Sequence, residues 1–425
     1  MSRTLRVGAL QLPAHDRDRF AEVWPDIVAS VYAAARSGVE LLVLPEGTVP
    51  SYVVGFDAYD PSETDAAVHE LCDVARTCAI VIVAGVVRRE GGTLRNSAVV
   101  VDADGTIAGV ADKHFLWGFD RQWFSPGEGF APIPTRVGRI GALVCADGRI
   151  PTIARALVER GADLLAMPTA WVTSGRDPAN LENPLADVLA RTRARENGTP
   201  IVCADKCGAE LGCVAYAGKS QIVDAAGTVL AIASQQRPEF IQAEIELSTT
   251  PRIFARVDDL QPRVATPVSD SFRIAFAAAR EIRAHDERLT IVEAQALIAP
   301  ATGIDELHKL VPAVCVDDEK MIDPAFLVRY RCSGYQLVLW RASCDAQWQE
   351  LFARARATEL RLFVVVLGGE RAFAVDPDGA VVAGTFDGYE IATFYFEGTR
   401  TMRTLVAPGT DILDEFRGVA RLLER

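Results

Sequence analysis

The sequence predicts a layered α/β protein, in which helices cover the faces of β-sheets. Over roughly the first 250 residues, short apolar runs rich in β-branched residues alternate with amphipathic helical patterns, as in proteins whose strands and helices pack in layers. Turn signals such as Asp104-Gly105 separate neighbouring runs, because Asp-Gly supplies the dihedral angles of a tight hairpin. A hydrophobic content of 49% and a charged content of 24% are typical of a globular protein with a large core.

The predicted elements follow this alternation along the chain. Strands are predicted where apolar runs are short, and helices where apolar residues recur three or four positions apart. In order, these are a strand over 4–10, a helix over 20–38 that ends at a glycine, a strand over 41–44, a helix over 66–78, strands over 80–87, 97–101 and 140–144, a helix over 151–160 that begins with a proline, a strand over 164–167, a helix over 185–197, a strand over 200–204 and a strand–turn–strand over 221–230.

Length, charge and cysteine usage exclude several classes of protein. The 425 residues exceed one typical domain of about 150, so two or three domains are expected. The net charge of −13 disfavours nucleic acid and anionic membrane as partners. Nine scattered cysteines indicate a reducing compartment rather than a disulfide framework. The first residues do not fit a signal peptide, and no run of about 20 apolar residues predicts a membrane span, so a cytoplasmic location is expected.

The later part of the chain repeats patterns of the first part. Four segments match in the same order, namely 144–148 with 314–318, 162–166 with 335–339, 190–197 with 353–360 and 223–231 with 375–383. The first match pairs Cys145 with Cys315. The alternative is that two α/β segments share generic patterns. A polar stretch with prolines near 255–270 marks a boundary, which predicts a catalytic domain over 1–255 and a second unit over 265–425.

Cys145 is a candidate nucleophile because of where it lies in the predicted structure. It ends an apolar strand and precedes the turn Asp147-Gly148, with a helix from Pro151. A nucleophile on such an elbow is exposed at the sheet edge, where backbone N–H groups can bind an oxyanion. The amide of Ala146 is the natural donor. The alternative is that Cys145 is a small core residue.

Glu46 and Lys113 occupy two similar settings. Glu46 comes just after a buried strand, where burial would raise the pKa of its carboxyl and favour acid–base catalysis. Lys113 follows an apolar hairpin and lies among aromatic residues, where a lysine is costly unless paired. A fixed cation beside a thiol would favour the thiolate and stabilise negative charge on a substrate oxygen. A solvated loop glutamate and a surface lysine are the alternatives.

Together these settings make the chain resemble the nitrilase superfamily of carbon–nitrogen hydrolases. The matching segments lie within residues 1 to about 250 and are 44–46, 112–114, 144–151, 161–165, 168–171, 195–197 and 218–224. The resemblance implies a four-layer αββα sandwich with a second, truncated α/β unit. It also implies a Glu46–Lys113–Cys145 triad, in which Glu46 carries protons, Lys113 stabilises the tetrahedral intermediate and Cys145 forms an acyl enzyme. Neither metal nor cofactor is expected.

Departures from the family's pattern bear on the site and on the substrate. Asp120 stands where relatives carry a second glutamate, and its shorter side chain predicts a shorter reach toward Lys113; Glu128 is a weaker substitute. Asp205 follows Ala204 where relatives often have Ala-Asn. Ala146 follows the nucleophile, where nitrile-cleaving members usually have tryptophan. An amide or carbamoyl substrate is therefore preferred over a nitrile.

Residue types indicate which side chains could line a pocket, and cysteine spacing disfavours a metal site. Aromatic residues that could line an apolar pocket are Phe115, Trp117, Trp123 and Trp171. Of these, Trp171 is preferred as a substrate-binding residue, and Asp120 and Ala146 are the other two candidates for an auxiliary role. The alternative is that most of the aromatic residues lie in the core. The spacing of the cysteines at 203, 207 and 213 is unlike common zinc sites, and no glycine-rich phosphate loop is present.

The second unit is expected to be non-catalytic. Residues 265–315 offer no counterpart of Glu46 or Lys113, so Cys315 should be an unactivated thiol. The predicted function is hydrolysis of a small amide-like compound, with nitrile hydrolysis or acyl transfer by the same triad as alternatives and a pseudoenzyme or scaffold as the alternative of another class. The resemblance implies pairing through a helical face, either as a homo-oligomer or as an internal pseudo-dimer with the second unit.

Overall fold

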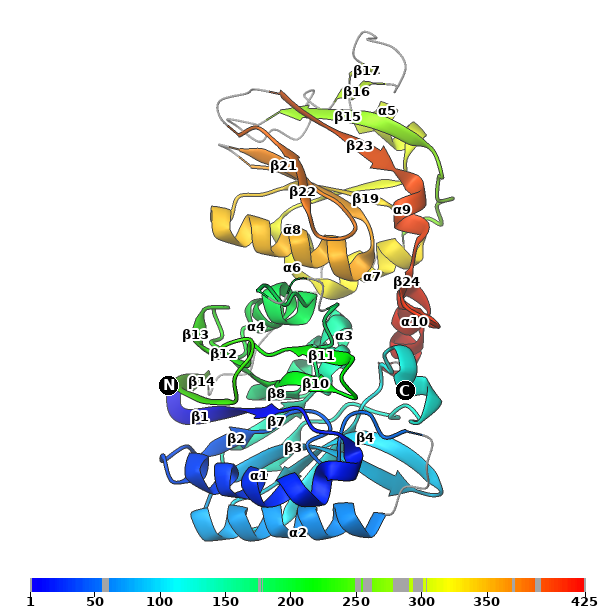
Figure 1. Cartoon of the computed structure of the whole chain (residues 1–425). Coiled ribbons are helices and arrows are strands. Elements are labelled where there is room, and N and C mark those ends of the chain that lie inside the picture. Colours follow the sequence, from blue (N-terminus) through cyan, green and yellow to red (C-terminus); the bar gives the residue numbers. More distant parts are fainter. Residues whose placement is uncertain are drawn as a thin grey trace. The chain divides into compact units, whose positions relative to one another are not determined.

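The chain divides into two compact units, residues 1–254 with 421–425 and residues 255–420 (Figure 1). The computed structural model of the chain describes residues 2–55, 61–174, 177, 179–248, 254, 262–277, 290–292, 301–302, 304–368, 371–386 and 391–423. Within these residues, no helix combines the length and the apolar character that crossing a bilayer requires.

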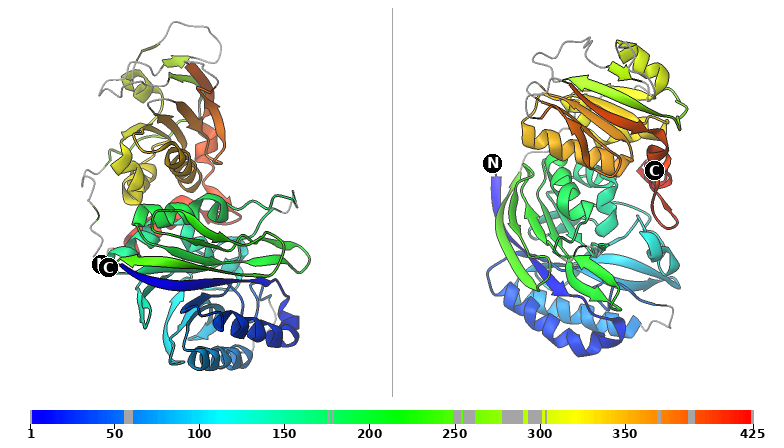
Figure 2. Two further views of the ribbon diagram at one scale, coloured as in Figure 1. Left: turned by 90° about the vertical axis from the view of Figure 1, so that its left-hand side faces the viewer. Right: turned by 45° about the horizontal axis from the view of Figure 1, so that its top comes forward.

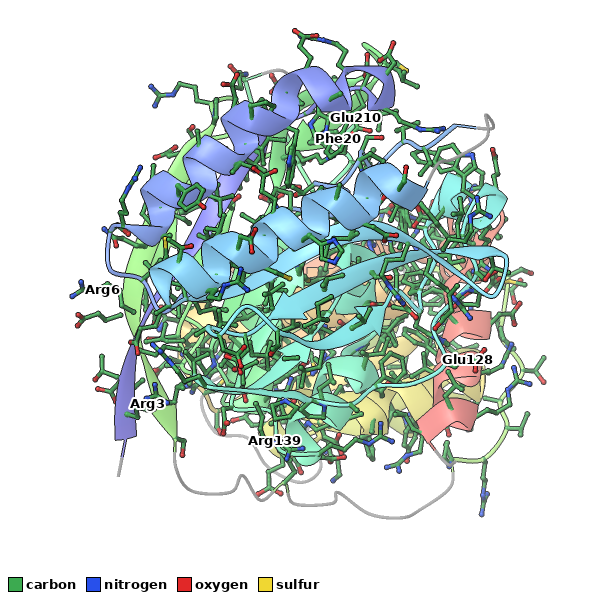
Figure 3. All side chains as sticks on the ribbon, turned by 90° about the horizontal axis from the view of Figure 1, so that it is seen from below. Arg3, Arg6, Phe20, Glu128, Arg139 and Glu210 are labelled. Atoms are coloured by element: carbon green, nitrogen blue, oxygen red, sulfur yellow. The ribbon has the colours of Figure 1, made fainter. Side chains whose placement is uncertain are left out.

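The first sheet of the first unit is mixed and eight-stranded. Its order is β11-β10-β1-β2-β3-β4-β5, with β14 also paired to β1. The strands are β1 (Ser2–Pro13), β2 (Leu41–Val43), β3 (Val81–Glu90), β4 (Thr93–Val101), β5 (Ile107–Asp112), β10 (Lys206–Glu210), β11 (Val214–Ala217) and β14 (Glu239–Ser248). Helices α1 (Phe20–Ala35) and α2 (Pro61–Cys78) lie across one face (Figure 3), where their apolar residues share a core with β1–β4.

The second sheet is six-stranded, in the order β13-β12-β9-β8-β7-β6. Its elements are β6 (Ile133–Thr135), β7 (Gly138–Ala142), β8 (Leu164–Pro168), β9 (Ile201–Ala204), β12 (Gln221–Val223), β13 (Val229–Ile232) and the helices α3 (Pro151–Glu159) and α4 (Ala190–Asn197). The helices contact this sheet, and β2 and β3 contact β8 across the interior. The first unit is therefore a four-layer αββα sandwich, as predicted (Figure 2).

Several element boundaries differ from the predictions for local physical reasons. Helix α1 ends at Ala35 rather than Gly38, because the chain turns and Gly38 takes a left-handed conformation with φ +88°. Helix α2 begins at Pro61, earlier than predicted, since proline suits a first helical turn. The predicted helix over 185–197 begins with a wider π turn, Leu185–Leu189, before α4.

Two larger sheets of the second unit pack around an apolar core. One has the order β18-β19-β20-β21-β22 and the other β17-β16-β15-β23. The elements are β15 (Ser271–Ala277), β16 (Thr290–Val292), β17 (Ala301–Thr302), α5 (Ile304–Leu310), β18 (Ala313–Val316), α6 (Asp318–Ile322), α7 (Pro324–Cys332), β19 (Leu337–Arg341), α8 (Ala346–Leu360), β20 (Phe363–Leu367), β21 (Ala372–Val375), β22 (Val381–Gly384), β23 (Ile391–Glu397), α9 (Gly398–Met402), β24 (Leu405–Ala407), β25 (Thr410–Asp411) and α10 (Ile412–Leu423).

The five-stranded sheet of the second unit has the same strand order and directions as β7-β8-β9-β12-β13 of the first. In both sheets the first three strands are parallel and the last two are antiparallel. A register shift lies between the last two strands of each, at Ile222/Val223 and at Ala374/Val375. The order of elements that suggested an internal repeat is thus present in both units.

The pairing of Cys145 with Cys315 is wrong. Helices α3 and α7 begin at Pro151 and Pro324, and the sixth residue before each proline is Cys145 in one unit and Asp318 in the other. Cys315 lies inside β18, paired with Leu339, whereas Cys145 comes after the end of β7. Similar residues in an apolar strand produced the false match, while the helix start fixes the true position of the elbow.

Candidate active site

Three strand ends bring the predicted catalytic residues together. Glu46 follows β2, Lys113 follows β5, and Cys145 follows β7 of the facing sheet. The Lys113 Nζ lies 2.7 Å from Glu46 Oε1, and both side chains are fully buried. Cys145 is close enough to both for their charges to shift the pKa of its thiol. The convergence that the sequence predicted is thus present.

The position of Glu46 depends on a close approach of two backbones. A Cβ at Gly85 of β3 would lie 2.3 Å from the carbonyl oxygen of Pro45, so only glycine lets β3 pass beside Glu46. Glu46 Oε1 accepts hydrogen bonds from Lys113 Nζ and from Asn96 Nδ2, both at 2.7 Å. Glu46 Oε2 has no hydrogen-bond partner among the described residues. Burial raises the pKa of this carboxyl above its ordinary value, which suits a group that exchanges protons.

Asp120 reaches Lys113 despite its shorter side chain. Its Oδ2 accepts hydrogen bonds from Lys113 Nζ at 2.6 Å and from the backbone N–H of Trp117 at 2.9 Å. Its Oδ1 accepts a hydrogen bond from the hydroxyl of Tyr52 at 2.8 Å. Lys113 therefore lies between two carboxylates. Burial favours its neutral amine, but Asp120 and Glu46 outweigh that effect and hold the pKa of Lys113 well above its ordinary value.

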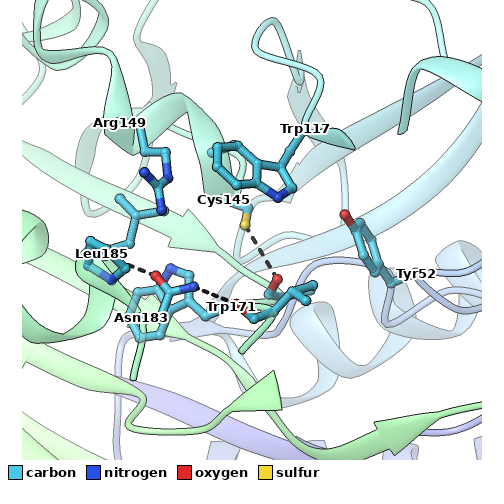
Figure 4. Close-up of a pocket in the computed structure, with 11 residues that line it drawn as sticks. Tyr52, Trp117, Cys145, Arg149, Trp171, Asn183 and Leu185 are labelled. Carbon is cyan, nitrogen blue, oxygen red and sulfur yellow. Dashed lines mark hydrogen bonds between the residues drawn. The ribbon is translucent and has the colours of Figure 1, made fainter. Parts of the chain in front are cut away.

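Cys145 adopts a strained conformation at the elbow. Its φ of +45° lies in the left-handed region, which is uncommon for a residue with a side chain and is found at functional turns. Its Sγ lies 3.6 Å from the carbonyl oxygen of Ala170 (Figure 4). Burial and the charge of Glu46 raise the pKa of the thiol well above its ordinary value, while Lys113 lowers it. The resting thiol is therefore protonated and needs a base to become a nucleophile.

A small pocket opens beside the thiol, with a cavity volume of about 80 Å³ (Figure 4). Its lining residues are Tyr52, Trp117, Cys145, Ala146, Arg149, Ala170, Trp171, Val172, Asn183, Pro184 and Leu185. Of the residues predicted for the pocket, Ala146, Trp117 and Trp171 line it. Phe115 and Trp123 do not: Phe115 packs edge-on against Trp117, and Trp123 packs against Phe119.

Asp205 replaces the amide that relatives often carry, and it supports the Trp171 wall. Its Oδ1 accepts a hydrogen bond from the backbone N–H of Trp171 at 2.8 Å. Burial raises the pKa of Asp205 well above its ordinary value, which favours the uncharged carboxyl. A neutral carboxyl has nearly the same shape as an amide, which explains how an aspartate is tolerated at this position.

Comparison with known proteins places this site in a family. The profile described as carbon-nitrogen hydrolase matches residues 6–253, more than half of the chain. This chain belongs to the carbon-nitrogen hydrolase family. A nitrilase from Pyrococcus abyssi is 34% identical over 228 residues, which span 50% of this chain and 79% of the relative. An (R)-stereoselective amidase from Pseudomonas sp. is 30% identical over 229 residues, spanning 53% and 80%.

Solved structures agree with this assignment. An amidase from Nesterenkonia sp. matches with a TM-score of 0.51 and 28% identity, over 56% of this chain and 89% of that protein. The prediction of an amidase-like carbon–nitrogen hydrolase with the nitrilase fold is confirmed.

Several residues at the site of this hydrolase could not be identified from the sequence. Tyr52, Asn96, Arg149 and Asn183 contact the buried charges or line the pocket. Asn96 lies within β4, and its contact with Glu46 depends on the pairing of β4 with neighbouring strands, which no local pattern reveals. Arg149 carries a weak signal, because it lies in the turn just after the nucleophile.

The described residues of this hydrolase contain no group of three or more His, Cys, Asp or Glu side chains arranged to hold a metal ion. Cys203 and Cys207 are buried, and Cys213 is exposed at the β10–β11 turn.

Proposed function

We propose that this hydrolase cleaves the C–N bond of a small amide or carbamoyl compound through an acyl enzyme on Cys145. The observation that carries the proposal is the buried Glu46–Lys113 pair beside a protonated thiol that lines the pocket. Glu46 Oε2 is the oxygen available to take the thiol proton, since Oε1 is held by Lys113 and Asn96.

The proposed reaction uses each group in turn. Glu46 removes the proton of Cys145 as Sγ attacks the carbonyl carbon, and the carbonyl oxygen gains negative charge. The ammonium of Lys113 and the backbone N–H of Ala146 stabilise that charge. Glu46 then gives the proton to the leaving nitrogen, the C–N bond breaks, and ammonia or an amine departs. A water molecule loses a proton to Glu46 and attacks the thioester carbon, and the C–S bond breaks. The acid is released, and Glu46 returns the proton to the thiolate of Cys145.

Asp120 is proposed to support this chemistry through Lys113. Two carboxylates beside one ammonium keep it charged, so the cation is available at every step.

Trp171 is proposed to form the wall of the pocket, and the volume of about 80 Å³ favours a compact substrate. Arg149 brings positive charge to the pocket and stacks with its guanidinium 4.4 Å from the ring centre of Trp117. A substrate that carries a carboxylate beyond the scissile bond would complement it.

Ammonia release from a panel of compounds tests this function. The panel contains neutral amides, amides and carbamoyl compounds with a carboxylate, and nitriles. Turnover is expected on amides or carbamoyl compounds, faster for those with a carboxylate, and absent in Cys145→Ala. Ammonia from nitriles alone would contradict the substrate class, and no turnover on any compound would favour a scaffold.

The second unit is proposed to be a truncated, non-catalytic copy of the later half of the first. The matching strand order supports this, as does Asp318 at the position of Cys145. Asp318 accepts hydrogen bonds from Trp340 Nε1 at 2.9 Å and from Ser343 Oγ at 2.5 Å, so its side chain serves the local structure. Burial raises the pKa of the Cys315 thiol, which disfavours its thiolate form.

We expect this unit to act as an internal pseudo-partner for the catalytic unit. A shortened chain that ends near residue 260 should then lose solubility or form dimers, because the catalytic unit would lack the pairing partner that the family resemblance implies. Light scattering and activity measurements on the shortened and full chains check this expectation. A shortened chain that stays soluble, monomeric and fully active would remove the basis of the pseudo-partner.

A further inference from the structure

A second buried ion pair lies outside the proposed triad. Lys206 and Glu210 both belong to β10, and Lys206 Nζ lies 2.5 Å from Glu210 Oε1, with at most 1% of either side chain exposed. Burying two charges is costly unless further hydrogen bonds satisfy them. The further hydrogen-bond partners of this pair therefore indicate which segment of the protein it stabilises.

Three further hydrogen bonds of the pair go to the loop that follows Glu46. Glu210 Oε2 accepts from the backbone N–H of Val53 at 2.7 Å, and Oε1 accepts from that of Tyr52 at 3.3 Å. Lys206 Nζ donates to the carbonyl oxygen of Gly47 at 2.8 Å. The pair thus holds the backbone on both sides of the loop.

The loop folds back closely on itself between Gly47 and Tyr52. Gly47 has φ +56°, and a Cβ there would lie 2.4 Å from the backbone of Tyr52. The end of the loop at Gly47 touches Glu46 directly, and the other end carries Tyr52. The ion pair consequently fixes the positions of both residues.

Tyr52 connects the loop to the buried charged residues through hydrogen bonds. Its hydroxyl donates to Asp120 Oδ1 at 2.8 Å, and Asp120 Oδ2 accepts from Lys113 at 2.6 Å. The ring of Tyr52 also lines the pocket (Figure 4), with its centre 5.5 Å from Lys113 Nζ. Without a fixed Tyr52, Asp120 would lose one of the contacts that hold it against Lys113.

We infer that Lys206 and Glu210 are positioning residues that hold the Gly47–Val53 loop so that Tyr52 keeps Asp120 and Lys113 aligned with Glu46. The inference rests on the proposed function, because it assigns the pair to the same site. His15 and Tyr216 also face the pair. Asp205 is also close enough to Lys206 for their charges to interact. Burial lowers the pKa of His15 and raises the pKa values of Tyr216 and Asp205, which favours the uncharged form of all three side chains.

A Glu210→Gln variant tests the inference. The amide NH₂ must face a backbone N–H or the Lys206 ammonium, so a donor meets a donor and the loop shifts. We expect kcat to fall about 10- to 100-fold, with a smaller change in KM. As Lys113 loses its alignment, Glu46 loses part of the cation that lowers its pKa. The acid limb of the pH profile should therefore move about 0.5 to 1 pH unit higher.

The rate of alkylation of Cys145 by chloroacetamide, measured against pH, provides a readout that needs no turnover. In Glu210→Gln the acid limb of this alkylation profile should move upward as well, and Lys206→Met should show the same shift. Lys206→Arg keeps the positive charge and should retain the acid limb of the wild type. Tyr52→Phe should show the shift too, and adding Glu210→Gln to it should slow the reaction by no more than about threefold, since both act through one contact.

Glu196→Gln is the matched control, because Arg193 and Glu196 form an equally buried ion pair in α4 and neither lines the pocket. It should lower thermal stability but leave the limb in place. If Glu210→Gln and Lys206→Met fold and keep the original limb, or if Glu196→Gln shifts it equally, the positioning role is wrong. If no compound is turned over but the alkylation profile shifts as described, the proposed reaction fails while the positioning role stands.

Discussion

A Glu46→Gln variant is expected to lose turnover by about 10³- to 10⁴-fold. Glutamine fills the same buried space but cannot take the proton of Cys145 or deprotonate the water that attacks the thioester. Because burial raises the pKa of the thiol well above its ordinary value, little nucleophile forms without that base. The loss should appear in kcat and kcat/KM alike, since the carboxylate acts in the transition state. Steady-state ammonia release measures both.

The pH profile gives this variant a second signature. Burial raises the pKa of Glu46, and only the ionised carboxylate can accept a proton, so wild-type activity falls as the pH drops through that raised pKa. The residual activity of Glu46→Gln should lack this limb. Glu196→Gln, which removes a buried carboxylate outside the pocket, should keep both the limb and the turnover. Wild-type turnover in Glu46→Gln would mean that another group is the base.

The strand-end residues could be predicted because each follows a short, local pattern. A buried apolar run followed by a polar residue identifies a strand end from a few neighbouring letters, and Glu46, Lys113 and Cys145 all have this setting. Catalytic groups of layered α/β proteins gather at such ends. The resemblance to a family then joined three local signals into one site.

The supporting residues could not be predicted because their contacts are set by distant parts of the chain. Asn96 reaches Glu46 only through the register of β4, and Glu210 binds the Tyr52 backbone across 158 positions of sequence. A similar limit produced the false match of Cys315 with Cys145. The residues around the two cysteines are similar in sequence, but the strand pairing places Cys315 within β18.

Lys113→Met is expected to damage both stability and activity. The substitution leaves the carboxylates of Glu46 and Asp120 buried without the ammonium that contacts each of them. Removing one partner of a buried charge cluster costs about 3–5 kcal/mol in the free energy of unfolding. Lys219→Met is a suitable control, because Lys219 pairs with a partly exposed Asp187 and its loss should cost about 1 kcal/mol at most. Denaturant unfolding at neutral pH measures both values.

The loss of stability in Lys113→Met should shrink as the pH falls. Lys113 lowers the pKa of Glu46, so without it the already raised pKa of the buried carboxyl rises further. The penalty of a buried, unpaired carboxylate is present above that pKa and disappears as the pH drops through it, because the carboxyl takes up a proton. Turnover should also fall, by about 10²- to 10³-fold, since the forming oxyanion loses its cation. If the variant unfolded at the same denaturant concentration as wild type from acid to neutral pH, Lys113 would not balance the charges of the two carboxylates. The proposed role of the Lys113 cation in catalysis would then lose its support.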